Sequence, residues 1–311
     1  MGPEPPTSDA LAPSRPALYW RATRPLYLPT SVLPAAAGAL VAIGEPDAVW
    51  WFMPLALLAL LLVHAGTNVV NDVEDFAHGV DGPEKMDNSR VFTTGLLSVR
   101  EGRHLGLACF GLAAVIGVGI ALAQGPAILL YGTLGVLGGY LYTGGPRPYK
   151  HVGLGDPLII LLMGPLMTQG AYSAVTGEWF SAAAFWCGFF PGLLIAGVLQ
   201  GNNASDIAAD RAAGVRTLAV RLGFRRARAL YVASLGLAYL TVPLLWVTGI
   251  FDWQILIALA TLPLAFARAR QALSARAEGD PALLTLAPGT AQLHLLASAS
   301  LVAAVIVERS L

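Results

Sequence analysis

The sequence predicts an all-α integral membrane protein with nine transmembrane helices, and three observations support that prediction. The 311 residues are 56% hydrophobic and 12% charged, against about 25% charged residues in ordinary soluble domains. Nine apolar runs are long enough to cross a bilayer as helices. Loops rich in Lys and Arg alternate with loops that have none. The 19 basic and 19 acidic residues balance, and no basic stretch interleaved with aromatic residues indicates a nucleic-acid partner.

The expected helices follow these apolar runs. They cover Leu26–Ile43, Val49–Val70, Leu105–Ala123, Ala127–Thr143, Leu158–Val175, Phe180–Leu199, Leu230–Thr248, Trp253–Ala269 and Thr290–Val307. Residues 1–20 are rich in Pro and polar residues at their start, so we expect a disordered cytosolic segment there without a cleavable signal peptide. Residues 21–311 are expected to form a single transmembrane domain.

The placement of Lys and Arg predicts the orientation in the membrane. Basic residues gather before the first run and after the second, fourth, sixth and eighth. The connections 44–48, 124–126, 176–179 and 249–252 contain no Lys or Arg. Since positive loops stay in the cytosol, we expect a cytosolic N-terminus and an external C-terminus in the cell membrane. An odd number of helices fits this alternation.

Two acidic motifs close the second and sixth runs, on the side expected to be cytosolic. They consist of Asn68, Asn71, Asp72 and Asp75, and of Asn202, Asp206 and Asp210. Their spacing places each set on one helix face. A carboxylate at membrane depth costs about 2.5 to 3.5 kcal/mol, and neither cluster contains a Lys, so we expect an imported cation to compensate the charge. Ligands that are all oxygen favour Mg²⁺, shared with substrate phosphates.

The loops after the motifs add basic side chains. Asp81, Lys85 and Arg90 follow the first motif and Arg216 follows the second, in a segment expected to form a short helix across the cytosolic mouth. Carboxylates beside Lys and Arg are suited to a diphosphate with Mg²⁺ and to stabilising pyrophosphate as it departs.

Other chemically capable residues have simpler explanations. The candidates for lining a substrate cavity are Tyr140, Tyr142, Tyr149, Lys150 and Tyr172. Tyrosine faces can stabilise a cation, but interfacial tyrosines are also common anchors in membrane proteins. His64 and His294 are expected to be hydrogen-bonded core residues, and Cys109 and Cys187 buried thiols.

Segments Asn71–Asp81 (NDVEDFAHGVD) and Asn202–Gly223 (NNASDIAADRAAGVRTLAVRLG) resemble the two Asp-rich motifs of the UbiA superfamily of intramembrane prenyltransferases. The branch that prenylates 1,4-dihydroxy-2-naphthoate in the menaquinone pathway is the most similar, through Leu141–Asp156 (LYTGGPRPYKHVGLGD) and Thr290–Leu296 (TAQLHLL). The resemblance extends from about Arg24 to Val307. The motif of the CDP-alcohol phosphotransferases, another membrane family, is absent from the sequence.

This resemblance implies a fold, a chemistry and a set of roles. The helices would surround a central cavity with a cytosolic cap, and an isoprenyl diphosphate would ionise there before an aromatic acceptor attacks. Asp72, Asp75, Asp206 and Asp210 would be catalytic and, with Asn68, Asn71 and Asn202, would hold Mg²⁺. Asp81, Lys85, Arg90 and Arg216 would bind the diphosphate.

Several positions depart from the family pattern and leave alternatives open. Ser205 stands where the family commonly has Arg, Val73 where it has Tyr, and Lys150 and His151 also differ from the quinone branch. One alternative is a terpene cyclase of the same superfamily, which converts the diphosphate without an aromatic acceptor. The other is a cation-coupled transporter, which is disfavoured because the carboxylates lie at helix ends beside basic loops and not at broken midplane helices.

Overall fold

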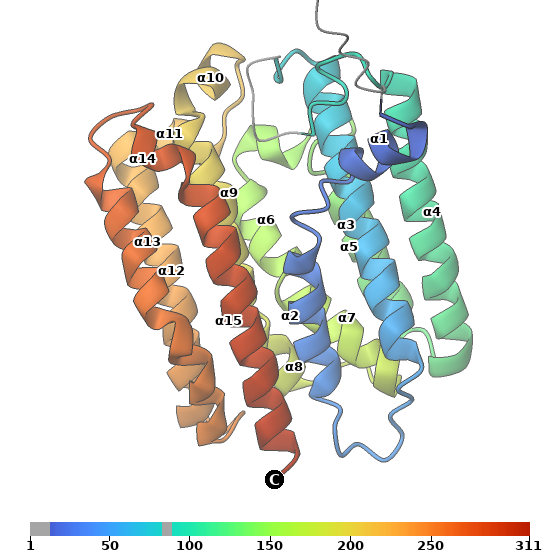
Figure 1. The fold of residues 1–311 in the computed structure, drawn as a ribbon. Coiled ribbons are helices and arrows are strands. Elements are labelled where there is room, and N and C mark those ends of the chain that lie inside the picture. Colours follow the sequence, from blue (N-terminus) through green and yellow to red (C-terminus); the bar gives the residue numbers. More distant parts are fainter. Residues whose placement is uncertain (1–12, 83–88) are drawn as a thin grey trace, which may run out of the picture.

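The computed structural model describes residues 13–82 and 89–311, and the regular structure in these ranges is entirely helical. The long helices run side by side along one axis of the bundle (Figure 1). The first half contains α1 (Arg15–Ala22), α2 (Pro29–Leu40), α3 (Phe52–Ala77), α4 (Val99–Gln124), α5 (Ala127–Tyr140), η1 (Tyr149–Val152), α6 (Gly155–Leu162) and α7 (Pro165–Thr176). The second half contains α8 (Ala182–Cys187), α9 (Phe189–Ser205), α10 (Ile207–Ala212), α11 (Leu218–Leu222), α12 (Phe224–Val247), η2 (Trp253–Thr261), α13 (Leu262–Ser274), α14 (Pro281–Leu284) and α15 (Leu286–Arg309).

Each of the nine expected runs contains helix, but the helices differ in length. Within the described ranges, seven helical segments are long and apolar enough to cross a membrane. The other two are α2, with 12 residues, and α5, with 14, and both are shorter than the roughly 20 residues that span a bilayer. The all-helical membrane fold is therefore confirmed, and nine full spans remain a prediction.

Close contacts between backbones hold the central helices together. A Cβ atom on Gly38 of α2 would lie 2.2 Å from the carbonyl oxygen of Thr168 on α7. Similarly, a Cβ on Gly188, before α9, would lie 2.7 Å from the carbonyl carbon of Gly164, at the break between α6 and α7. Only glycine permits these approaches. The glycines therefore allow α2 to cross α7 closely, and they allow the break between α6 and α7 to pack against the break between α8 and α9.

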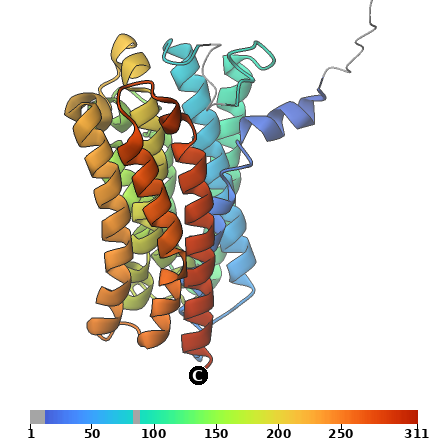
Figure 2. The same cartoon turned by 60° about the vertical axis from the view of Figure 1, so that its left-hand side comes forward.

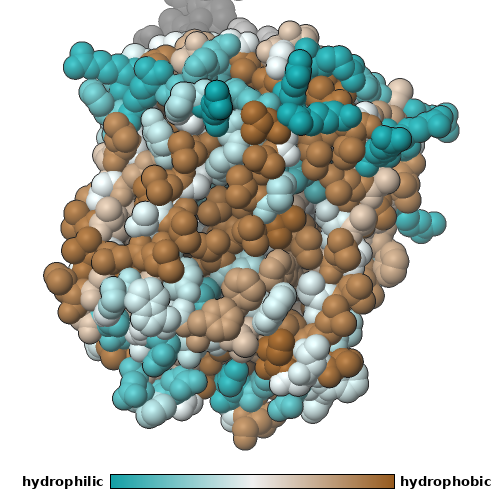
Figure 3. Space-filling view, turned by 180° about the vertical axis from the view of Figure 1, so that it is seen from behind, coloured by the Kyte–Doolittle hydropathy of each residue, from teal (hydrophilic) through white to brown (hydrophobic). Residues whose placement is uncertain are grey.

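The outer surface matches a bilayer environment. On the face shown in Figure 3, hydrophobic residues cover the middle of the molecule, and hydrophilic residues gather at its two ends. On α4, Leu112, Val115 and Leu122 are 57%, 70% and 85% exposed. Apolar exposure on this scale is unfavourable in water and favourable in lipid.

Helix α1 corrects the expectation of disorder for residues 15–20, the last part of the segment 1–20. It begins at Arg15 and lies outside the bundle, at the end opposite the C-terminus (Figures 1 and 2). Leu18 and Ala22 are buried in a cluster with Val73 and Phe92. Because this apolar side is covered, a packed helix forms within the segment for which composition predicted disorder. Residues 1–12 lie outside the described ranges.

Candidate active site

A cavity of about 210 Å³ is lined by residues from α2, α3, α5, α6, α9 and α10. Part of its wall is apolar and includes Leu60, Leu162, Met163 and Ile195. Both acidic motifs reach it, through Asn68 and Asn71 of the first and Asn202, Asp206 and Asp210 of the second. The structure therefore brings together two motifs that are more than 120 residues apart in the sequence.

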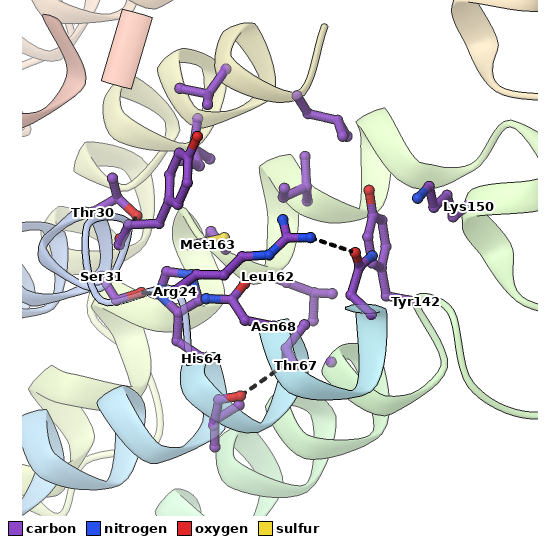
Figure 4. A pocket seen from close by; sticks show the side chains of 18 of the residues that line it. Arg24, Thr30, Ser31, His64, Thr67, Asn68, Tyr142, Lys150, Leu162 and Met163 are labelled. Carbon is purple, nitrogen blue, oxygen red and sulfur yellow. Dashed lines mark hydrogen bonds between the residues drawn. The ribbon is translucent and has the colours of Figure 1, made fainter. Parts of the chain in front are cut away.

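The first motif lies on the last turns of α3, where its two carboxylates are buried and paired with cations. The side chains of Asp72 and Asp75 are each 2% exposed. Asp72 forms an ion pair with Arg24 and accepts a hydrogen bond from the backbone N–H of Ser89 at 2.8 Å. Asp75 lies 2.5 Å from Nζ of Lys150. Both cations also line the cavity (Figure 4).

The expectation was that an imported cation compensates the first acidic cluster, because the cluster contains no Lys. These ion pairs show instead that distant parts of the chain supply cations to it. Arg24 is 48 residues from Asp72 and Lys150 is 75 residues from Asp75, so the partners could not be found by looking within the motif. Burial alone would lower the pKa of Lys150, but the adjacent Asp75 carboxylate outweighs it and leaves the pKa raised. The chain itself thus supplies positive charge at this end of the cavity.

The second motif spans a break in the helix, so it does not lie on the single helix face that its spacing predicted. Helix α9 ends at Ser205, and α10 begins at Ile207 after Asp206. The Ser205 hydroxyl donates to the Asn202 carbonyl at 2.7 Å, competing with continued helix, and also lies 3.1 Å from Asp206 Oδ1. Thr217, which caps α11, donates to Asp210 Oδ2 at 3.2 Å. Despite the break, all three predicted ligands of this motif line the cavity.

Of the aromatic candidates, Tyr142 and Tyr149 line the cavity. Their rings meet edge to face with centroids 5.3 Å apart, and Lys150 Nζ lies 5.9 Å from the Tyr142 ring centroid. Burial raises the pKa of the Tyr149 phenol, which donates a hydrogen bond to the Gly138 carbonyl. Tyr140 and Tyr172 do not line it: Tyr140 packs edge-on against a Phe of α4, and Tyr172 belongs to the main hydrophobic core. For these two, a place in a substrate cavity stays a prediction.

The predicted diphosphate ligands occupy different surroundings. Asp81 is 5% exposed, and its backbone N–H donates to the Asp75 carbonyl at 3.2 Å, so it lies beside the first motif. Arg90 is half-buried in the loop before α4 and has a left-handed backbone conformation (φ 62°). Arg216 is exposed and is not among the residues that line the cavity. Lys85 lies outside the described ranges.

The oxygen ligands suit a metal that is shared with a substrate. Within residues 13–82 and 89–311, no group of three or more His, Cys, Asp or Glu side chains is arranged to hold a metal ion by itself. The cavity instead presents two Asn side chains of the first motif and Asn202, Asp206 and Asp210 of the second. The two carboxylates of the first motif are buried and paired with Arg24 and Lys150. Mg²⁺ is normally held by one or two carboxylates together with substrate phosphates, so these residues fit Mg²⁺ in the presence of a phosphorylated ligand.

His64 also lines the cavity, which its expected role as a core histidine did not include. It lies on α3, and its Nδ1 is 2.7 Å from Ser31 Oγ on α2 (Figure 4). The expectation of a hydrogen bond is correct, but the ring is at the cavity wall. Its spacing of four residues from Asn68 was the available signal, because residues at i and i+4 share a helix face.

A second cavity, of about 300 Å³, lies against the first and is lined mainly by apolar residues of α3, α4, α5 and α7. The two cavities share Leu60, Val63, Gly135, Leu162 and Met167 as wall residues. No atom outside the local backbone lies within 4 Å of the position of a Cβ on Gly135. This glycine therefore leaves open space where the two cavities adjoin.

The fold and this site define a membrane protein with acidic and basic groups at one end of an apolar interior. The UbiA prenyltransferase family model matches residues 31–298, so the chain belongs to the UbiA prenyltransferase family and is a prenyltransferase. It is 34% identical to 1,4-dihydroxy-2-naphthoate octaprenyltransferase of Mycobacterium tuberculosis over 69% of this chain and 73% of that one. Identity to the enzyme of the same name from Bacillus subtilis is 28%, over 75% and 74% of the two chains.

Solved structures share the fold. A UbiA homologue from Archaeoglobus fulgidus, bound to GPP and Mg²⁺, superposes with a TM-score of 0.65 at 20% identity. The match covers 92% of this chain and 99% of that one. The family expected from the two Asp-rich motifs is thus confirmed by the sequence comparisons, and the all-helical architecture is confirmed by the structural one.

Proposed function

We propose that this protein is an Mg²⁺-dependent enzyme that ionises an isoprenyl diphosphate and transfers the prenyl group to an aromatic acceptor of the dihydroxynaphthoate type. The observation that supports this proposal most directly is the meeting of both acidic motifs with Arg24 and Lys150 at one end of an apolar cavity. Such an arrangement suits a single substrate that has an anionic head group and an apolar tail.

The polar end would bind the diphosphate. Arg24 and Lys150 would donate to phosphate oxygens as they leave their carboxylate partners, and the freed carboxylates would then be available to a metal. The metal would be held by Asn68, Asn71, Asp72, Asp75, Asn202, Asp206 and Asp210, with Asp81, Lys85, Arg90 and Arg216 supplying further charge around the mouth. When bound, Mg²⁺ would stabilise the negative charge that develops on pyrophosphate as the C–O bond breaks.

The apolar part would hold the isoprenoid. The second cavity continues from the first through five shared wall residues and offers room for the tail. At the reacting end, the aromatic faces of Tyr142 and Tyr149 would stabilise the allylic cation. A phenol with a raised pKa, as at Tyr149, stays protonated and does not trap the cation as a phenolate would.

The acceptor class rests on the relatives. Those from Mycobacterium tuberculosis and Bacillus subtilis are named for 1,4-dihydroxy-2-naphthoate. We propose the same class for this chain, with the mouth and N-terminus in the cytosol, the C-terminus outside, and nine helices of which α2 and α5 are the short ones. The short helices α10 and α11 would form the cap.

Release of pyrophosphate from labelled isoprenyl diphosphates by the purified protein tests the proposal. We expect release with Mg²⁺, loss with EDTA, and prenylated product when dihydroxynaphthoate is added. Asp75→Asn and Asp206→Asn should each reduce turnover by about a hundredfold or more, since each removes a charged ligand. Glu74→Gln is the matched control, because Glu74 lies between the two α3 carboxylates but pairs outward with Arg103 at 2.8 Å.

Two results would contradict the proposal. Wild-type turnover in both Asp variants would exclude the metal assignment. Conversion of the donor into a cyclic hydrocarbon, with no prenylated acceptor formed, would support the terpene cyclase alternative instead.

A further inference from the structure

The wall of the cavity includes a titratable side chain, His64, that has no role in the proposed binding of the diphosphate. Among the described residues that line the cavity, His64 is the only histidine. Its Nδ1 is engaged by Ser31 Oγ at 2.7 Å, so Nε2 is the nitrogen that the ring can offer to a ligand. If Nδ1–H donates to the serine oxygen, Nε2 carries a lone pair and can accept a proton.

The position of His64 along α3 separates it from the metal end. Asn68 is four positions after His64, a rise of about 6 Å along the helix, and Asp72 is eight positions after it, a rise of about 12 Å. All three share one helix face because they are spaced by four residues. Asn68 donates its amide N–H to the Thr23 carbonyl at 3.0 Å. A ring bound at the depth of His64 would therefore lie just below a diphosphate held at the mouth.

The surroundings at this depth suit an aromatic ring with a hydroxyl group. Leu60, Leu162 and Met163 line the cavity with His64 and provide apolar contacts. A hydroxyl in such surroundings needs a hydrogen-bond partner, because an unpaired buried hydroxyl is costly. His64, held in place by Ser31, supplies that partner.

From this geometry we infer that the His64–Ser31 pair binds the hydroxyl of the aromatic acceptor and that His64 Nε2 takes up its proton as the prenyl group is transferred. This inference rests on the proposed function. The C–O bond of the donor breaks with its electron pair leaving on pyrophosphate, and a ring electron pair of the acceptor forms the new C–C bond. The hydroxyl proton passes to Nε2, and the ring oxygen regains it as the hydrogen on the attacked carbon departs. One proton is released per turnover.

The test compares His64→Gln with wild type in two separate measurements. Pyrophosphate release from labelled geranyl diphosphate with Mg²⁺ reports ionisation, and C-prenylated product reports transfer. We expect His64→Gln to retain release but to lower transfer by about 10²-fold or more, as for loss of a general base, and to raise KM for the acceptor but not for the donor. Ser31→Ala, a milder change, should alter the same ratio in the same direction.

A substrate-side change makes the test specific for the hydroxyl. Wild type should transfer poorly to an acceptor whose hydroxyls are methyl ethers, and His64→Gln should lose most of this discrimination, since the two changes remove the same interaction. His294→Gln is the matched control, because His294 is fully buried on α15 and does not line the cavity. It should keep the wild-type ratio of transfer to release.

The outcomes separate this inference from the function it rests on. Failure of the wild type to release pyrophosphate from any donor would overturn the proposed function itself. If the wild type releases pyrophosphate normally, two results would refute the role of His64. One is transfer by His64→Gln at the wild-type rate, and the other is a parallel loss of release and transfer in this variant. Should His64→Gln not fold, Ser31→Ala with the two acceptors decides the matter.

Discussion

The ion pair between Arg24 and Asp72 should make the ligand-free protein depend on a residue 48 positions away from the acidic motif. The side chains are 16% and 2% exposed, and the Asp72 carboxylate also accepts a hydrogen bond from the Ser89 N–H. Removing one member of a buried pair leaves an uncompensated charge and costs about 3 to 5 kcal/mol. We therefore expect Arg24→Gln to lower the free energy of unfolding by about that amount in EDTA.

A double-mutant cycle isolates the ion pair from other effects of the Arg24 change. Arg24→Gln combined with Asp72→Asn removes both charges, so it should cost about 1 to 3 kcal/mol less than the sum of the single changes. Unfolding equilibria in detergent, measured without metal, supply the four values. Arg103→Gln is a control: it breaks the exposed pair with Glu74, and we expect a cost below about 1 kcal/mol. Additive costs for Arg24 and Asp72 would refute the account of how the chain balances its own carboxylates.

Three further predictions follow from the fold. A cysteine at Ser98 should be labelled only from the cytosol and one at Asp252 only from outside; labelling of both from one side would exclude the proposed orientation. Gly135→Leu should fill the space between the cavities and lower turnover of long isoprenyl donors more than turnover of geranyl diphosphate. Gly236→Leu, on the outer face of α12, should not. An equal effect of Gly135→Leu on donors of every length would refute the tail assignment. Gly38→Ala, measured by thermal unfolding, should be strongly destabilising because its Cβ would meet backbone of α7 at 2.2 Å; a near-neutral effect would contradict that contact.

Much of the fold follows from local patterns in the sequence. Apolar runs predict where helices form because a helix satisfies its own backbone in lipid, whatever it packs against. The sequence also indicated that the two acidic motifs would meet. Each motif stands at the end of an apolar run, on the side of the membrane expected to be cytosolic. Short helices were harder to foresee: α2 begins only at Pro29, although its apolar run starts at Leu26, because a turn of chain precedes it.

Residues whose role depends on distant partners could not be assigned in this way. Arg24 looked like one of several arginines that set topology, and the sequence does not encode its left-handed backbone (φ 52°) or its approach to Asp72 in any local pattern. The same reason explains why the position of Tyr172 was not foreseen. Its aromatic side chain is of a type that can line a cavity, but it belongs to the main hydrophobic core. Spacing along one helix is visible in a sequence, whereas the face that a neighbouring helix covers is not.

Ser205 offers the most direct test of how much positive charge the site requires. The family pattern has Arg at this position, whereas here the serine hydroxyl donates to the Asn202 carbonyl at the break before Asp206. Arg24 and Lys150 already line the cavity, so ionisation of the donor should not need a third cation.

We expect Ser205→Arg to change the reaction of the prenyl cation with the acceptor (its capture) and not the ionisation of the donor. An added guanidinium beside Asp206 would attract the carboxylate of the acceptor, and one charge-assisted hydrogen bond of about 1.5 kcal/mol corresponds to about tenfold in affinity. Wild type should accordingly form some alcohol or hydrocarbon without an acceptor, and Ser205→Arg should shift the ratio toward prenylated product at low acceptor concentration. Ser205→Lys, which lacks the bidentate fork, should shift it less. If wild type consumes the donor only when a dihydroxynaphthoate is present, ionisation is coupled to acceptor binding, and the missing arginine does not explain any loss of capture.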